Sequence, residues 1–319
     1  MKNKSEWIPD RHPSKGADAY HKAVINTSWH IANVTELIKK IRNFIKINSV
    51  IVDFGAGTGS SAVFLVKNFP KAKLILTDNS ASWLTNSYNI LHKKKNIKFF
   101  LLKKQNEKYL TLNKLVGNKS ADIILAFNTV HLIPDISYVF EGIYDTLKKG
   151  GKFAFQSGNI KLKDRKDGIM MIDDSISKIH DISIDIIRND KRFKKYKKDI
   201  KKKIKEQVLQ RKIIFPLPRN LDLYTKALKS AGFKNQKISR KVIRIKFKDW
   251  LDFLRVKRLQ AGILPEIGGR FPAKDEISDR DQIITIASKK LFSDLKKNNP
   301  MANSSSFCAE WVYVIADKI

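Results

Sequence analysis

The sequence predicts an α/β protein built on a doubly wound, mostly parallel β-sheet. Short apolar runs rich in β-branched residues alternate with helix-like segments over about 110 residues, which is the pattern of successive βαβ units. The first of these runs ends at a cluster of glycines, where the chain can turn tightly. Hydrophobic residues make up 42% and charged residues 29% of the 319-residue chain, which excludes a disordered or fibrous protein.

The predicted elements follow one another regularly up to residue 157. Apolar spacing at three and four predicts two helices within residues 20–45, after a polar, proline-containing arm over 1–20. Asn33 or Thr35 is the expected cap of the second helix. The strands that follow are predicted at 49–54, 73–77, 97–102, 121–127 and 152–156, and the helices between them at 60–68, 81–92 and 136–147. Gly150 and Gly151 stop the last of these helices.

The alternation breaks after residue 157. Helices are expected over much of 158–216 and at 221–230, 250–259 and 279–295, strands within 233–247 and at 311–316, and a loop at 262–272. We therefore divide the chain into an N-terminal arm with cap helices (1–47), a core (48–157), a basic helical lid (158–216) and a C-terminal part of the core with a second helical insertion (217–319).

The charge balance favours an anionic partner. Lysine and arginine number 63 against 31 acidic residues, a formal charge of +32. Such a field attracts nucleic acid, an anionic membrane surface, or an acidic carrier protein or substrate. Cys308 is the single cysteine, so neither a disulfide within the chain nor a cysteine metal site is expected. The sequence lacks both a membrane-spanning run and an apolar N-terminal signal, so we expect a cytoplasmic protein, with a peripheral place at a membrane surface left open.

The glycine loop has a spacing that discriminates between ligands. Gly55, Gly57 and Gly59 follow the first strand, whereas dinucleotide sites place the third glycine where this chain has Ser60. Asp53 precedes the loop, where a carboxylate repels a pyrophosphate but accepts hydrogen bonds from a cationic amino-acid ligand. Asp78 ends the next strand, where a carboxylate accepts from ribose hydroxyls.

With these motifs, residues 48–158 resemble the class I S-adenosylmethionine-dependent methyltransferases. The resemblance rests on the D-F-G-A-G-T-G loop, the Leu76-Thr77-Asp78 strand end, the segment 122–134 and the Gly150-Gly151 pair. It implies a Rossmann-like, seven-stranded sheet with S-adenosylmethionine as the cofactor. The implied cofactor-binding residues are Asp53, Gly55, Ala56, Gly57, Gly59, Asp78, Asn79, Gln105, Asn106 and Asn128. Trp83 would border the adenine, and Gln105 stands where the family usually has an aspartate that accepts from the adenine amino group.

The end of the fourth core strand, A-F-N-T-V-H-L-I-P over 126–134, bears on the substrate. Asn128 is not followed by the Pro-Pro-aromatic pattern of amine-directed nucleic-acid methyltransferases, and no Pro-Cys pair for cytosine attack occurs here. The segment resembles instead the small-molecule branch that includes trans-aconitate and malonyl carrier-protein methyltransferases. His131 is the candidate catalytic acid or base and a substrate contact, with packing of the following loop as the alternative. Tyr20 is a second candidate substrate contact, and no metal cluster is expected.

The predicted activity is methylation of a small-molecule or acyl substrate, expected to be anionic. An RNA methyltransferase that uses the basic surface, or a non-catalytic cofactor-binding scaffold, are the alternatives. Between Arg188 and Lys205 the chain has eleven basic and two acidic residues. Phe193, Tyr196, Ile200 and Ile204 form an apolar seam there on a predicted cationic helix, which could pack on the domain, lie on a membrane, or bind an acidic carrier or RNA.

Overall fold

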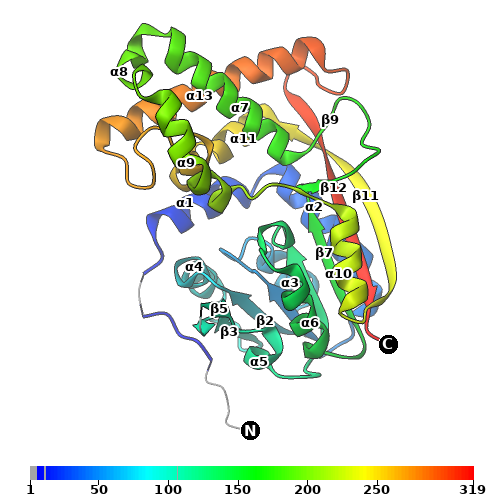
Figure 1. Cartoon of the computed structure of the whole chain (residues 1–319). Helices are drawn as coiled ribbons and strands as arrows, with labels where there is room; N and C mark the ends of the chain where they lie inside the picture. The colour runs from blue at the N-terminus through cyan, green and yellow to red at the C-terminus, as the bar shows by residue number, and fades with distance from the viewer. Residues whose placement is uncertain (1–5, 11, 106) are drawn as a thin grey trace. The chain divides into compact units, whose positions relative to one another are not determined.

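The computed structural model of the chain describes residues 6–10, 12–105 and 107–319 (Figure 1). These residues form two compact units. The sheet unit contains the described residues up to Ile160, together with Arg219–Lys241 and Trp311–Ile319. The helical unit contains Lys161–Pro218 and Val242–Glu310.

A mostly parallel β-sheet is the centre of the sheet unit. Its strands are β1 (Val50–Phe54), β2 (Lys73–Asp78), β3 (Ile97–Leu101), β6 (Ala121–Phe127), β7 (Leu147–Ser157), β11 (Lys234–Lys246) up to Lys241 and β12 (Ser306–Asp317) from Trp311. In the described chain their order is β11-β12-β7-β6-β1-β2-β3, and the short strand β9 (Ile169–Met170) pairs with β12 as an eighth strand, one more than the predicted seven. The pairs β1–β2, β1–β6, β2–β3 and β6–β7 are parallel, and β12 runs antiparallel to β7. The predicted fold class is thereby confirmed, and the loops after β1, β2 and β6 meet at one edge of the sheet.

Helices cover this sheet and explain why its central strands are almost wholly apolar. The sheet unit contains α1 (Lys15–Val24), α2 (Ser28–Ile41), η1 (Arg42–Phe44), α3 (Ala62–Asn68), α4 (Ala81–Leu91), α5 (Leu112–Val116), η2 (Val130–Leu132), α6 (Ile136–Thr146) and α10 (Leu221–Ser230). Shorter strands are β4 (Lys104–Gln105), β5 (Lys108–Tyr109), β8 (Ile160–Lys161) and β10 (Arg219–Asn220). α2 and α6 pack on β7, and α4 packs on β2 and β3. Phe153 and Phe155 of β7 are fully buried between these layers.

The start of the chain differs from the prediction in two places. α1 begins at Lys15, inside the range predicted as a loose arm, because the Ser14 hydroxyl accepts from the Ala17 backbone N–H at 3.2 Å and caps the helix. The N-cap of α2 is Thr27, so the predicted caps Asn33 and Thr35 lie inside the helix. Asn33 is fully buried and its side-chain oxygen accepts from Gln156 at 3.0 Å. Its side-chain amide therefore forms a hydrogen bond in the protein interior and does not cap a helix end.

The helical unit has its own core. It contains β9 (Ile169–Met170), which pairs with β12, and α7 (Ile172–Asn189), η3 (Lys191–Phe193), α8 (Lys194–Lys197), α9 (Ile200–Ile214), α11 (Phe247–Leu254), α12 (Lys257–Ile263) and α13 (Lys274–Asn298). Trp250 and Phe307 are buried within it, and α13 packs along α7. No helix in the described part of the chain is long and apolar enough to span a membrane.

Two predicted helices of this unit are interrupted. The cationic helix expected through residues 193–204 consists of η3, α8 and α9, because Asp190 ends α7 and its carboxylate accepts from the Arg192 backbone N–H at 3.0 Å. Phe193, Tyr196 and Ile200 of the predicted seam are nevertheless buried, and Ile204 is half-buried. The helix predicted over 250–259 is divided between α11 and α12, since Val256 becomes the N-cap of α12.

Candidate active site

The glycine loop after β1 is tightly bound to its surroundings. Gly55, Gly57 and Gly59 have φ angles of +74°, +57° and +83°, a region that side chains rarely adopt. A Cβ at Gly55 would overlap the side chain of Thr129, and one at Gly57 would lie 3.3 Å from the Trp83 ring. The loop therefore needs glycine both for its turn and for the close approach of its neighbours.

Two carboxyl groups flank this loop, and their hydrogen bonding differs. Asp78 accepts from the backbone N–H groups of Gly57 and Ser80, each at 2.8 Å. Asp53 is fully buried, and in the described chain neither of its side-chain oxygens has a hydrogen-bond partner. Burial raises the pKa of Asp53 to about 8, and the nearby negative charge of Asp78 adds to the shift.

An unpartnered buried carboxyl group is an unfavourable arrangement that a ligand can correct. A buried polar group without a hydrogen bond costs roughly 1–3 kcal/mol, and a buried charge costs more. An ammonium group placed against Asp53 would supply both donors and a compensating charge. The residues present therefore fit a ligand with a cationic amino-acid end, as the sequence predicts for S-adenosylmethionine.

Residues of α1 and α2 lie beside the loop. The Tyr20 and Trp83 rings are 4.6 Å apart between centroids, so α1 brings Tyr20 to the side of Gly57. His21 Nδ1 is 3.3 Å from the Thr58 hydroxyl. His30 is 4% exposed, and burial lowers its pKa to about 4, so its ring is neutral near neutral pH.

The segment after β6 approaches the same edge of the sheet. Asn128 has a φ of +49°, and its backbone N–H donates to the Gln156 carbonyl at 3.0 Å. Its side-chain oxygen accepts from the indole N–H of Trp311 at 3.2 Å. The Thr129 hydroxyl donates to the Gly55 carbonyl at 3.2 Å, which ties this segment to the glycine loop.

His131 is held by a neighbouring serine and a cation. Its Nδ1 is 2.9 Å from the Ser157 hydroxyl, which also accepts from the Asn159 backbone N–H at 3.0 Å. Burial lowers the pKa of His131 to about 4, and the positive charge of Arg219 lowers it further. The imidazole is therefore neutral near neutral pH.

Arg219 holds the loop that contains His131. Its guanidinium donates to the backbone carbonyls of Val130, His131, Ile133 and Pro134, at 3.2, 3.3, 2.7 and 3.2 Å respectively. It also lies over the Tyr224 ring, 5.4 Å from the centroid. Because one rigid planar group meets four carbonyls, the path of the loop is fixed from β6 to the start of α6.

The remaining predicted site residues lie farther out or cannot be placed. Ala56 is buried within the loop, whereas Asn79 and Gln105 have exposed side chains. Asn106 lies outside the described residues. Among the described residues, no cluster of side chains suited to a metal ion is found.

Sequence reasoning missed Ser157, Arg219 and Trp311. Each meets its partner across a long stretch of chain, from 26 residues for Ser157 and His131 to 183 for Trp311 and Asn128. No local motif marks such residues. The one local signal is the asparagine at position 128, since asparagine adopts a positive φ more readily than most residues, and its φ here is +49°.

Comparison with known families agrees with this geometry. A family model described as a methyltransferase domain matches residues 52–153, which include the glycine loop, Asp78 and His131. No curated protein matches the sequence. The domain match confirms the methyltransferase class that the sequence predicts.

Solved structures share the fold at low identity. A candidate methyltransferase from Bacillus halodurans is 15% identical, with a TM-score of 0.51, over 90% of this chain and 99% of its own. A candidate sarcosine dimethylglycine methyltransferase from Galdieria sulphuraria is 14% identical, with a TM-score of 0.51, over 96% and 98%. Phosphoethanolamine N-methyltransferase 2 of Haemonchus contortus, solved with phosphomonomethylethanolamine and S-adenosylhomocysteine, is 18% identical, with a TM-score of 0.51, over 95% of this chain and 57% of its own. These likenesses establish the fold that the chain shares with these proteins.

Proposed function

We propose that this chain transfers a methyl group from S-adenosylmethionine to an anionic small-molecule or acyl substrate. The observation that carries the proposal is Asp53, a fully buried carboxyl group without a partner in the described chain, placed directly before the glycine loop. In its ionised form this group would repel a pyrophosphate, whereas the ammonium of an amino-acid ligand would stabilise that form and favour loss of the proton that burial retains.

The glycine loop and the residues beside it contact different parts of the cofactor. Asp53 faces the ammonium group, and the backbone of the loop from Gly55 to Gly59 holds the carboxylate end. Asp78 accepts from the ribose hydroxyls, in addition to the backbone N–H groups of Gly57 and Ser80. Tyr20 and Trp83 border the bound molecule on the α1 side. The cofactor supplies an activated methyl group, so the protein mainly positions the acceptor and excludes water.

The state of His131 favours an acceptor that is already ionised. A general base works best with a pKa near the operating pH, and the pKa of His131 is about 4. Its neutral ring is suited to hydrogen bonding with an acceptor rather than to removing a proton from a hydroxyl or amine. A carboxylate acceptor needs no base. It also agrees with the resemblance to trans-aconitate and malonyl carrier-protein methyltransferases, and with the net charge of +32.

Calorimetry tests the cofactor part of the proposal. We expect S-adenosylmethionine and S-adenosylhomocysteine to bind and NAD not to bind. The Asp78→Asn variant should bind S-adenosylmethionine more weakly by roughly 1–3 kcal/mol, because hydrogen bonds to a charged acceptor are lost. Glu141→Gln, which removes an exposed carboxylate from α6, is the matched control and should bind as the wild type does. Binding of NAD without binding of S-adenosylmethionine would refute the assignment.

Transfer of labelled methyl groups tests the acceptor. Pools of small carboxylates and of acyl carrier-protein thioesters should accept the label, while deproteinised transfer RNA should not. Efficient labelling of RNA alone would establish the nucleic-acid alternative. Cofactor binding without turnover on any pool would favour the non-catalytic scaffold.

A further inference from the structure

The solvent face of α9 combines two kinds of side chain. Positions three and four apart along the helix place four lysines and one glutamate (Lys201, Lys202, Lys205, Glu206 and Lys212) on the same face as Val208, Leu209 and Ile213. All eight side chains are exposed. We call these eight residues the α9 face.

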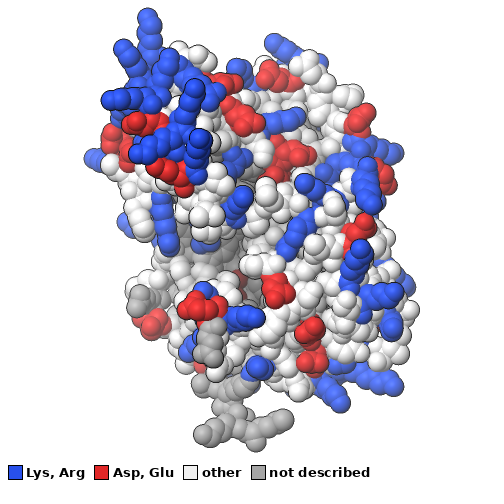
Figure 2. Space-filling model, in the orientation of Figure 1, with Lys and Arg blue, Asp and Glu red and all other residues white. Residues whose placement is uncertain are grey.

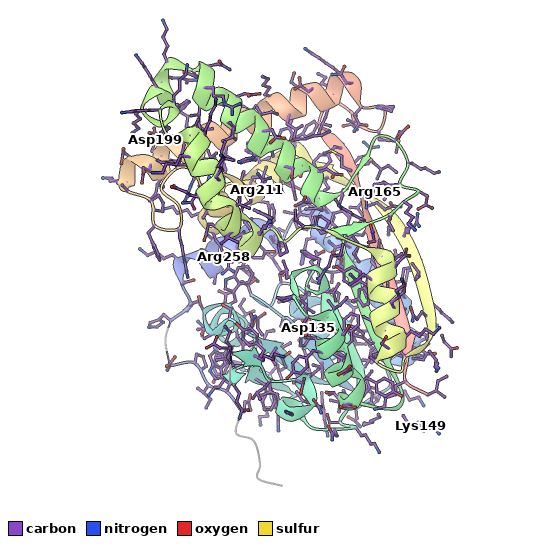
Figure 3. All side chains as sticks on the ribbon, viewed as in Figure 1. Asp135, Lys149, Arg165, Asp199, Arg211 and Arg258 are labelled. Carbon is purple, nitrogen blue, oxygen red and sulfur yellow. The ribbon has the colours of Figure 1, made fainter. Side chains whose placement is uncertain are left out.

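The opposite side of α9 already has its partners within the helical unit. Ile200 is 3% exposed, and Arg211 donates to the Ser177 hydroxyl of α7 at 3.2 Å. Figure 3 labels Asp199, the N-cap of α9, and Arg211, in its last turn. The α9 face is therefore not the packing surface of the helix, although it carries large aliphatic side chains.

The apolar part of this face is unusually open. Leu209 is 72% exposed and Ile213 is 73% exposed, one helical turn apart. Val208, on the same face, is 41% exposed. Isolated exposed apolar residues are ordinary, but three neighbouring aliphatic groups on one helix face indicate a contact surface.

The charge beside this apolar part is strongly positive. Figure 2 shows lysine and arginine side chains gathered over α8 and the first turns of α9. Ten basic residues lie between Lys191 and Lys205, against the single acidic residue Asp199. A second copy of this chain would bring two such clusters together, and their repulsion opposes self-association through this face.

We propose that the α9 face docks on an anionic membrane surface. Val208, Leu209 and Ile213 would enter the boundary between headgroups and acyl chains, and the lysines would meet the phosphates. RNA or an acidic carrier protein would supply negative charges that pair with the lysines, but neither requires exposed aliphatic groups on the same helix face. A bilayer interface offers phosphates to the lysines and an apolar region to the aliphatic side chains of the same face. This inference goes beyond the proposed methyl transfer and does not depend on it.

Sedimentation with lipid vesicles tests the proposal on the full chain. Vesicles of phosphatidylcholine with about one third phosphatidylglycerol should bind the protein, and vesicles of phosphatidylcholine alone should bind it roughly tenfold or more weakly. The Leu209→Ser/Ile213→Ser variant should lose roughly tenfold or more of the binding to anionic vesicles. Ile47→Ser, at a position 71% exposed in the sheet unit, is the matched control and should bind as the wild type does.

Two outcomes would overturn the inference. One is absence of binding to anionic vesicles by the wild type, with or without tight binding of transfer RNA. The other is equal binding by the wild type and the Leu209→Ser/Ile213→Ser variant, which would show that charge alone is responsible. Circular dichroism and binding of S-adenosylmethionine, measured on each variant, separate a loss of docking from a loss of folding and from a failure of the proposed function.

Discussion

Replacement of Asp53 by asparagine should stabilise the free protein while weakening cofactor binding. The pKa of Asp53 is about 8 in the folded chain and 3.8 for an unperturbed aspartate. Between these two values the folded state holds a proton that the unfolded state releases. The free energy of unfolding therefore falls as pH rises from about 4 to about 8, by about 1.4 kcal/mol per pH unit for this group. Near pH 7 the accumulated cost is about 4 kcal/mol.

Asparagine keeps the size of the side chain and does not titrate. The difference in unfolding free energy between Asp53→Asn and the wild type should thus grow by about 1.4 kcal/mol per unit between about pH 5 and about pH 7, then level off above about pH 8. Denaturant titrations across this range measure the difference directly. Parallel stability profiles for the two proteins would refute the reasoning from burial.

The same substitution should reduce affinity for S-adenosylmethionine. Loss of a hydrogen bond to a charged group corresponds to roughly 1.5–3 kcal/mol, or about tenfold or more in Kd. Affinity of the wild type should rise with pH up to about 8, because Asp53 must give up its proton to face an ammonium. Calorimetry in buffers of different ionisation enthalpy would detect the released proton. Unchanged affinity in Asp53→Asn would contradict the ammonium assignment.

Three further predictions concern neighbouring residues. Arg219→Gln should raise the pKa of His131 from about 4, because the guanidinium charge lowers that pKa, although burial should still keep it below 6.5. NMR titration of the imidazole measures this pKa, and an unchanged value would show that Arg219 acts on loop geometry alone. His131→Ala should raise KM with little change in kcat if the acceptor is a carboxylate, whereas a fall in kcat of roughly 100-fold would identify a general base. Gly55→Ala should lower stability by more than Gly150→Ala, because both glycines have positive φ but only the Cβ at Gly55 meets a side chain; equal melting temperatures for the two variants would contradict this.

The elements of the sheet could be predicted because their signals are local. Apolar runs, the glycine spacing and the aspartate at the end of β2 all lie within short windows of sequence. Residues whose role depends on distant partners could not be found in this way. Arg219 has no motif, and Asn33 has the side chain of a helix cap but is bonded to Gln156 in the interior. The break between α7 and α9 needed recognition of a local bond from Arg192 to Asp190, against a spacing that favoured one continuous helix.

The antiparallel pairing of β12 with β7 has a consequence for biosynthesis. β7 ends at Ser157, and the partner residues Val312–Asp317 leave the ribosome only after the whole helical unit has been translated. Until then one edge of β7 is unpaired, and Asn128 lacks its bond from Trp311. An unpaired strand edge invites aggregation, so the nascent chain needs shielding over this interval. A nonsense mutation shortly before the codon for Trp311 would therefore leave this edge of β7 unpaired and remove the bond to Asn128, a predicted cofactor contact.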